Sequence, residues 1–390
     1  MLATPAYATN KEVLVVLMER PRFGSSGFTT CGFLGQNDPV APRNSASTWQ
    51  TVLDQQVTTY YLTESNNAVN WQFKVVANPQ PGTNGWWPAQ QCSAYSGGNF
   101  GPTNLVADAA HRVLNLAHSQ GLISAAEIAN TRNFIVIDNR QTDQGQSDGV
   151  SAYAVTLLLP FIVRPSVVGE GSSNQTGVGV IRHELGNQLG LPELYSGPCP
   201  LVEPGGIVAT DDCYGGWDMA AFNANGFGVY ERMLAGWLSP KATTFEEQSW
   251  SGTISVSPLE QPNGDKLALI LSTESLLQPG SPLPPSPGPG TWQGYILECR
   301  RQIGDDAGLP SGGVLVTYFD STRGGNAPAL AVRTVPQERW RDAILKPGNT
   351  YSNSTLGVRV TYTGDAPNGS CVVSVNGRRP HSEDKVITGA

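Results

Sequence analysis

The sequence predicts an α+β protein of two domains, the first mixed and the second made of short strands. Two observations support this fold class. Up to about residue 245, short apolar runs that suit buried strands alternate with longer stretches in which apolar residues recur at helical spacing. After about residue 250, short alternating segments follow one another, with turn residues between them. We therefore expect an α+β domain over residues 1–245, a β-sandwich domain over residues 246–378 and a polar tail over residues 379–390.

The first expected element is a buried strand over residues 12–17, where Glu-Val-Leu-Val-Val-Leu is too short and too rich in valine for a helix. The elements expected after it are a helical stretch over 48–62, a strand over 71–76, a helix over 103–119, a strand over 133–138, strand-forming residues over 152–163 and a helix over 177–191. On the 103–119 helix, the expected buried face comprises Leu105, Val106, Ala109, Val113, Leu116 and Ala117.

The second domain is expected to contain only strands and turns. The predicted strands cover residues 253–256, 266–271, 295–300, 314–319, 358–362 and 371–375. Between two of them lies the proline-rich stretch 279–290, PGSPLPPSPGPG, which cannot pair into a sheet. We expect this stretch to form an exposed loop inside the second domain rather than a boundary between domains.

Composition and charge favour a secreted protein. Charged residues make up 14% of the 390 residues, and the 44 Gly and 29 Pro suit a loop-rich extracellular chain better than a charged cytosolic one. A net charge of -8 without any Lys/Arg cluster argues against nucleic acid as a partner. Sequons at Asn174, Asn353 and Asn368 are compatible with secretion. No apolar run reaches the roughly 18 residues of a transmembrane helix. We also expect the protein to be a monomer.

The cysteines are expected to form disulfides. They are Cys31, Cys92, Cys199, Cys213, Cys299 and Cys371. None belongs to a C-x-x-C pair, which argues against a zinc ribbon or a thioredoxin-like motif. An even number of widely spaced cysteines is typical of a chain that folds in an oxidising compartment. Several connectivities fit the sequence, and proximity favours Cys31–Cys92, Cys199–Cys213 and Cys299–Cys371.

The helix over residues 177–191 carries the candidate site. In the pattern H-E-x-x-H, two histidines one helical turn apart bind zinc and the glutamate between them activates water. This chain has H-E-x-x-N followed by x-x-G-x-x-E, so the expected metal ligands are His183, Asn187 and Glu193, with Glu184 as the catalytic base. Gly190 is able to adopt a positive φ and end the helix, after which the chain turns and brings Glu193 back towards the metal.

Two further residues are expected to support this site. Met219 ends the glycine turn Gly-Gly-Trp-Asp-Met, which resembles the methionine turn that metzincins place beneath the zinc. A methionine that simply fills a gap in the core would give the same local sequence. Tyr195 follows the third ligand and is a candidate for stabilising the oxyanion, although a packing role fits it as well.

The segments HELGNQLGLPELY, GGWDMA, GVYERMLAGWLSP and GYILECRRQIGDDAGLPSGGVLVTYFD resemble the immune inhibitor A family of secreted bacterial metalloproteases and, more distantly, the algal gametolysin-type proteases. The resemblance covers roughly residues 10–375. It implies a metzincin-like zinc (Zn2+) endopeptidase domain followed by an accessory β domain, often with structural calcium (Ca2+). Asp138, Asp143 and Asp148 lie in a stretch that resembles the family's calcium loop, but an ordinary solvated turn fits equally well.

The chain departs from the family pattern at Asn187, where the family has histidine. An amide oxygen is a weak, hard donor that suits calcium better than zinc, and the side chain is shorter than that of histidine. Two alternatives therefore stay open. In the first, the chain is a zinc endopeptidase that uses metal-activated water to hydrolyse peptide bonds of a protein or peptide. In this case Asn187 either reduces its activity or leaves it intact. In the second, the chain is an inactive homologue that binds protein or glycan.

Overall fold

The computed structural model describes residues 9–19, 44–89, 106, 108–139, 145–147, 164–169, 174–191, 226–237, 243–246, 249–261, 266–272, 293–309, 311–320, 329–331, 344–354 and 357–378. The chain contains both helices and sheets, as predicted. It divides into two compact units, Met1–Gly190 and Leu191–Ala390, earlier than the division predicted after residue 245. Among the described helices, none is long and apolar enough to cross a membrane.

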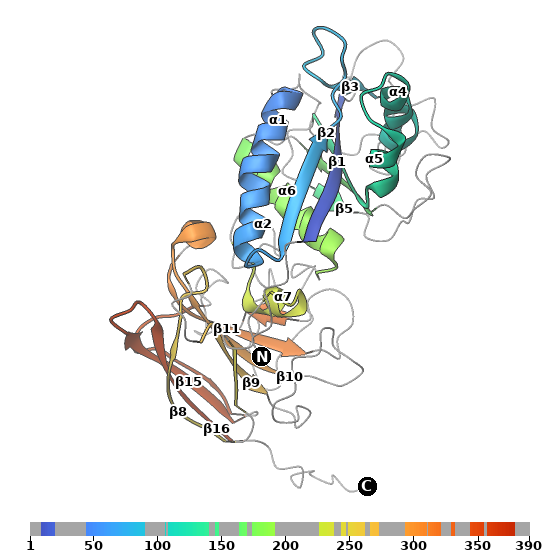
Figure 1. The fold of residues 1–390 in the computed structure, drawn as a ribbon. Coiled ribbons are helices and arrows are strands. Elements are labelled where there is room, and N and C mark those ends of the chain that lie inside the picture. The colour runs from blue at the N-terminus through green and yellow to red at the C-terminus, as the bar shows by residue number, and fades with distance from the viewer. Residues whose placement is uncertain are drawn as a thin grey trace, which may run out of the picture. The chain divides into compact units, whose positions relative to one another are not determined.

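The first unit is built on a largely parallel sheet (Figure 1). Its strands are β1 (Thr9–Glu19), β2 (Val69–Val75), β3 (Trp87–Pro88), β4 (Asn133–Asp138), β5 (Gly145–Ser147) and β6 (Arg164–Gly169). Their order is β2-β1-β4-β6-β5, and β3 pairs with β1. Among the described strands of this sheet, only β5 runs antiparallel to the strand beside it. The strands predicted over 12–17, 71–76 and 133–138 are confirmed as β1, β2 and β4, whereas the stretch 152–163 lies outside the described residues.

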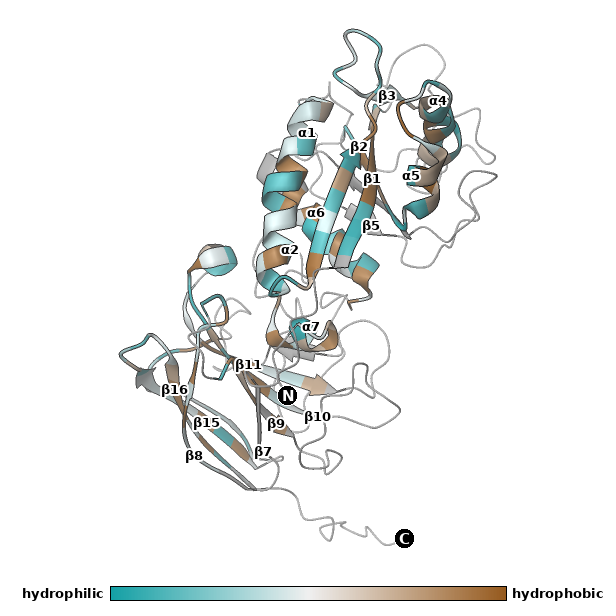
Figure 2. Cartoon of the chain, in the orientation of Figure 1, coloured by the Kyte–Doolittle hydropathy of each residue, from teal (hydrophilic) through white to brown (hydrophobic). Residues whose placement is uncertain are grey.

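Strand β1 shows why this sheet is buried. Its residues from Val13 to Met18 are all apolar and buried, so both faces of the strand are covered, as parallel sheets require. Figure 2 shows the apolar character of this strand. On one face, Leu14, Val16 and Phe134 pack in a core with the helices of residues 109–130. Figure 1 shows α1 and α2 on the opposite side of the sheet from α4 and α5.

The helices described in the first unit fall into three groups. The first is continuous and consists of α1 (Ala46–Val52), the π-helical turn η1 (Leu53–Val57) and α2 (Thr58–Glu64). The second consists of the π-helical turn η3 (Ala109–Val113), α4 (Leu114–Ser119) and α5 (Ala125–Asn130), and the third is α6 (Asn174–Leu189). The helices predicted over 48–62, 103–119 and 177–191 are thereby confirmed, whereas no strand or helix was predicted for the residues of α5.

The prediction that Leu116 belongs to the buried face is wrong. Leu116 is 39% exposed, whereas Ala110 and Leu114, which the regular spacing left out, belong to the core. The core residues Val106, Ala110, Val113 and Ala117 follow one another at helical steps of three and four residues, and Leu116 lies beside this face rather than on it. Val106, Ala109, Val113 and Ala117 of the predicted face belong to the core, and Leu105 lies outside the described residues.

The second unit contains α7 (Val229–Leu234), the 3-10 turn η6 (Gly304–Gly308) and two sheets. One sheet has the order β12-β11-β10-β9-β7, with β13 paired to β11, and the other has the order β14-β15-β16-β8. The strands are β7 (Thr243–Glu246), β8 (Ser249–Val256), β9 (Ala268–Ser272), β10 (Gln293–Arg300), β11 (Gly313–Asp320), β12 (Ala329–Ala331), β13 (Ile344–Leu345), β14 (Thr350–Asn353), β15 (Val358–Asp365) and β16 (Cys371–Arg378). All six predicted strands are present, while the proline-rich stretch 279–290 lies outside the described residues.

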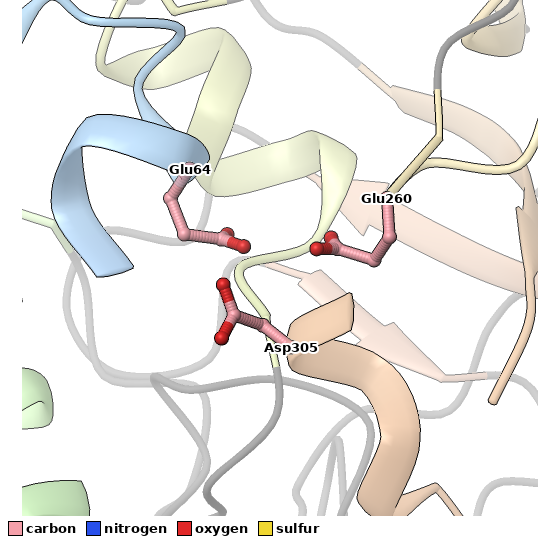
Figure 3. A group of neighbouring side chains, drawn as sticks. All are labelled: Glu64, Glu260 and Asp305. Carbon is pink, nitrogen blue, oxygen red and sulfur yellow. The ribbon is translucent and has the colours of Figure 1, made fainter. Parts of the chain in front are cut away.

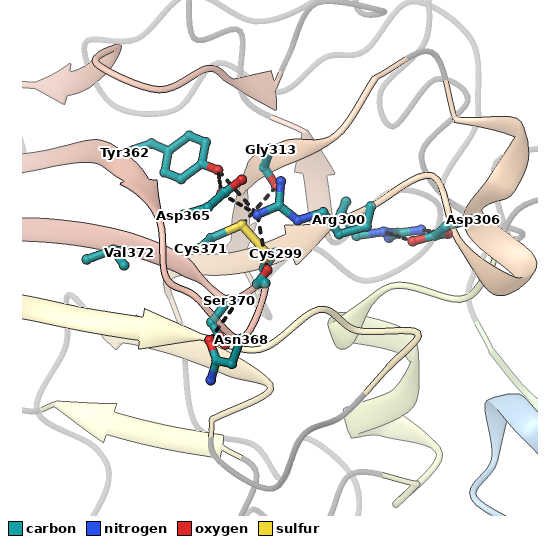
Figure 4. The surroundings of a disulfide bond; sticks show 12 residues. Cys299, Arg300, Asp306, Gly313, Tyr362, Asp365, Asn368, Ser370, Cys371 and Val372 are labelled. Carbon is teal, nitrogen blue, oxygen red and sulfur yellow. Dashed lines mark hydrogen bonds and ion pairs between the residues drawn. A yellow bond between two sulfur atoms is a disulfide. The ribbon is translucent and has the colours of Figure 1, made fainter.

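The two sheets of the second unit contribute to one core. Buried residues of β9, β10 and β11 pack with buried residues of β15 and β16 in a single cluster. A disulfide between Cys299 of β10 and Cys371 of β16 joins the sheets within this cluster (Figure 4). This pairing confirms the prediction, and the other two predicted disulfides lie outside the described residues.

A buried ion pair between β10 and η6 contacts the residues that precede α7. Arg300 of β10 and Asp306 of η6 are both fully buried and pair with each other (Figure 4). The Asp306 carboxylate also accepts a hydrogen bond from the Gly226 backbone N–H at 3.2 Å. Near the end of α7, Arg232 pairs with Glu260. These contacts account for the place of α7 in the second compact unit, although the sequence suggested a later division.

Candidate functional site

Helix α6 contacts β5, β6 and η1, and it buries polar groups as well as apolar ones. Leu185 is fully buried, as an anchor of the helix should be, but His183 and Glu184 are only 2% and 1% exposed. Gln188 is also buried, and its amide donates to the Phe134 carbonyl of β4 at 3.4 Å. Burying polar side chains costs free energy unless they find partners, and the hydrogen bond of Gln188 to β4 offsets this cost for its amide.

His183 and Asn187 lie together on one face of α6. The Asn187 Nδ2 atom is 3.3 Å from the His183 Nε2 atom. The amide donates this hydrogen bond when the imidazole Nε2 carries its lone pair. Residues four apart on an α-helix are neighbours on its surface, so this is the placement that the spacing predicts. The structure thus brings together two of the three predicted metal ligands.

The helix ends where the sequence predicted. Gly190 has a φ of 88°, and its backbone N–H donates to the Asn187 carbonyl at 2.9 Å. A left-handed residue directly after the last helical turn is the usual way for the chain to leave a helix. Glu193, Tyr195 and Met219 lie outside the described residues, so their predicted places at the metal stay predictions.

Helix α2 reaches α6 through Tyr61. The Tyr61 hydroxyl donates to the backbone carbonyl of Arg182 at 2.5 Å. Burial raises the pKa of Tyr61 well above its ordinary value; Arg182 opposes this shift, and the carboxylates of Glu64 and Glu184 add to it. Tyr61 therefore stays protonated and keeps its role as a donor beside the turn that carries His183 and Glu184.

The donors that α6 provides fit part of a metal site. An imidazole nitrogen suits zinc, and an amide oxygen four residues later faces the same side of the helix. The amide is the weaker donor, and its hydrogen bond to His183 must open before both groups bind one ion. Glu193 would supply the negative charge that this pair lacks. His183 and Asn187 thus offer two donor groups on one side of α6, and metal binding by them stays a prediction.

The predicted calcium loop is described only at its first residue. Asp138 ends β4 and is fully buried, and Asn139 beside it is also buried. This burial differs from the ordinary solvated turn that was the alternative for Asp138. Asp143 and Asp148 lie outside the described residues, and calcium binding here stays a prediction.

Three carboxylates that the sequence did not single out are shown in Figure 3. Glu64 ends α2 in the first unit, whereas Glu260 and Asp305 belong to the second unit. Glu260 pairs with Arg232, and burial raises its pKa even though the Arg232 charge opposes the shift. We assign no metal to these groups, because within neither unit do they form a set of three ligands.

Comparison of the sequence with models of known protein families and with curated proteins finds no match. The functional argument therefore depends on the α6 motif and on the geometry around it.

Proposed function

We propose that the protein is a secreted zinc-dependent endopeptidase whose metal is held by His183, Asn187 and Glu193, with Glu184 as the general base. The observation that carries this proposal is the placement of His183 and Asn187 on one face of α6. Glu184 is buried next to His183, and Gly190 has a positive φ directly after the last helical turn. This combination is expected for a metallopeptidase helix.

The chemistry assigned to the chain is proton transfer by Glu184. Zinc, when bound, lowers the pKa of water and polarises the peptide carbonyl. Glu184 accepts a proton from the attacking water and delivers it to the amine nitrogen as the peptide C–N bond breaks. Its nearly complete burial strengthens electrostatic interactions with the reacting groups, because little water screens them.

The sheet of the first unit supports a protein or peptide substrate. β5 is the last strand in the sheet order and, among the described strands, pairs only with β6. Helix α6 contacts β5 and β6. An extended peptide is able to add to such an edge by backbone hydrogen bonds, which hold a chain without requiring a particular sequence. We expect cleavage inside extended or unfolded segments.

The second unit supports the remaining parts of the proposal. Its two sheets share one core, as the sheets of a β-sandwich do, and we propose that it serves as an accessory domain. The disulfide between Cys299 and Cys371 supports folding in an oxidising compartment and therefore secretion. We propose that the protein acts as a monomer.

A second candidate function follows from the hydrogen bond between Asn187 and His183. This bond gives the buried imidazole a partner without any metal. An inactive homologue that binds protein or glycan would keep the fold of the helix in this way. The choice between the two candidates depends on whether zinc displaces the hydrogen bond.

The test is the substitution Asn187→His. Restoring an imidazole donor should raise zinc affinity by at least about tenfold, since even changes to outer-shell partners of a ligand alter affinity by that factor. Cleavage of unfolded casein should rise with it. Zinc content of the purified protein and casein hydrolysis are measured for both forms, and Glu184→Ala in the histidine form is the control that should bind zinc without cleaving.

Two results would contradict parts of this proposal. If Asn187→His binds zinc and cleaves nothing, the chain is not a peptidase and the binding function is favoured. If the unchanged protein already binds zinc and cleaves casein as fast as the histidine form, Asn187 does not weaken the site.

A further inference from the structure

Arg182, which directly precedes His183, is held by three contacts from the continuous helix α1–η1–α2. The Tyr61 hydroxyl donates to its backbone carbonyl at 2.5 Å. The Arg182 Nη2 atom donates to the Gln56 carbonyl at 3.1 Å, and the guanidinium carbon lies 4.3 Å from the centre of the Tyr60 ring. We call Gln56, Tyr60 and Tyr61 the Arg182 clamp.

The tyrosines of the clamp are packed in the interior of the first unit. The Tyr61 ring packs edge-on against Tyr60 and Trp71, with centroid distances of 5.4 and 5.6 Å, and Tyr61 and Trp71 are almost fully buried. Gln56 belongs to the π-helical turn η1, and such turns occur frequently at functional sites. Its carbonyl accepts from Arg182 rather than serving the helix alone. The backbone carbonyl and the guanidinium of Arg182 are therefore both held by residues of one continuous helix.

The backbone contact has a direct consequence for the site. The Arg182 carbonyl belongs to the peptide plane whose nitrogen is that of His183, so a hydrogen bond to this carbonyl restrains the peptide that places the His183 side chain. The next residue is Glu184, whose charge is near enough to Tyr61 to act on its hydroxyl. Catalytic groups need positions fixed within about half an ångström, which partners outside the reacting atoms provide.

We infer that the Arg182 clamp positions the His183–Glu184 turn of α6, with Tyr61 as a positioning residue that touches neither substrate nor metal. The inference rests on the proposed function for its effect on zinc and catalysis. Its effect on the α6 backbone does not depend on that function, so the two are tested separately.

The experiment compares Tyr61→Phe with Thr58→Val. Thr58 also lies on α2, and its hydroxyl donates to a backbone carbonyl, that of Trp71 of β2, at 2.8 Å. Both substitutions delete one hydroxyl-to-carbonyl hydrogen bond from the same helix, but only the Tyr61 bond ends on α6. Amide hydrogen exchange is measured for the α6 residues from His183 to Gly186 in the otherwise unchanged protein. Zinc affinity and the separate kcat and KM for casein peptides are measured in the Asn187→His background.

Tyr61→Phe should lower the protection of these α6 amides about fivefold, the factor that one ordinary hydrogen bond corresponds to. It should also weaken zinc binding about tenfold and lower kcat rather than raise KM. Thr58→Val should leave the α6 protection, zinc affinity and kcat unchanged. Equal effects of the two substitutions on α6 exchange would overturn the inference, since the loss would then be general.

A failure of the proposed function gives a different result. If the Asn187→His protein binds no zinc, the metallopeptidase proposal fails. The hydrogen-exchange comparison alone then tests whether the clamp holds the α6 backbone. Zinc binding that is unaffected by Tyr61→Phe, together with reduced α6 protection, would restrict the clamp to a structural role and overturn its part in the site.

Discussion

Arg300 pairs with two carboxylates inside the second unit. Its side chain is fully buried, and its Nε atom donates to Asp306 at 2.6 Å, while Nη1 donates to Glu298 at 3.2 Å. Both carboxylates are fully buried as well. The guanidinium compensates the charges of these carboxylates. A buried charge without a partner lowers stability much more than a buried pair does.

We therefore expect Arg300→Leu to lower the stability of the second unit by about 3–5 kcal/mol, the usual cost of leaving a buried charge uncompensated. The double variant Arg300→Leu/Asp306→Leu should recover part of this loss, since it removes one of the two stranded carboxylates. Urea unfolding of the three proteins measures the difference. A single variant as stable as the unchanged protein would show that the pair is not buried in solution.

Single residues also mark where sequence motifs stop being informative. Asn353 begins a sequon, yet it is 2% exposed, and its amide donates to the Tyr295 hydroxyl at 3.0 Å. Asn368, in the exposed turn between β15 and β16, begins an equivalent sequon. The motif is the same in both cases, and only the fold distinguishes an acceptor in the core from one on the surface. Of these two sequons, a glycan is compatible with the folded state at Asn368.

Helix α5 is expected to respond to pH through Glu127. Its first turn has a capping box between Ser124 and Glu127, and Glu127 also pairs with Lys74 of β2. The hydrogen bond from Lys74 and those from Ser124 lower the pKa of Glu127 to about 2. A lowered carboxyl pKa contributes stability above the ordinary value of 4.5, and this contribution is lost as the pH falls from there towards about 2.

Glu127→Gln should therefore reduce stability at about pH 6 and have little effect at about pH 2. The expected loss at the higher pH is below about 1 kcal/mol, because both partners are largely exposed and water screens the pair. Thermal unfolding across this pH range provides the measurement. A constant difference between the two proteins at every pH would show that the charge of Glu127 has no part in holding α5.

Elements with strong local signals were predictable from the sequence. The apolar runs of β1 and β4 and the alternation of β15 and β16 identified these strands. Helix α6 was recognised from its motif and from Gly190, whose positive φ is confirmed. Helices α5 and α7 were missed because each has only six residues, too few for a periodic pattern. The capping box at Ser124 and Glu127 was the readable signal for α5.

The candidate site could be predicted only where it is local. Spacing along one helix determines that His183 and Asn187 lie side by side, so their contact followed from the sequence. The contact of Tyr61 with Arg182 joins residues that are 121 positions apart, and no periodicity connects them. The same holds for the buried pairing of Arg232 with Glu260, since side-chain partners across a core depend on the packing of whole elements.

At the scale of the whole molecule, the disulfide is a covalent constraint on the second unit. Cys299 and Cys371 are separated by 72 residues, and closing a loop of this length in the unfolded chain corresponds to about 4 kcal/mol of stability. Cys299→Ala/Cys371→Ala should lower the free energy of unfolding of this unit by roughly that amount. Denaturant unfolding of the double variant, compared with the oxidised protein, is the measurement. A loss below about 1 kcal/mol would mean that the unfolded chain is already compact between these cysteines.

The same bridge turns the polypeptide from Cys299 to Cys371 into a covalent ring that holds β11 and β13 to β15. One hydrolysed peptide bond inside the ring opens it into a nicked chain but releases no fragment, so the mass of the oxidised protein changes only by one water. Strands on both sides of the nick stay tethered to the two sheets and at high local concentration. A protein that we propose cuts other chains outside the cell would thereby tolerate a cut to itself in this region, and only reduction would separate the pieces.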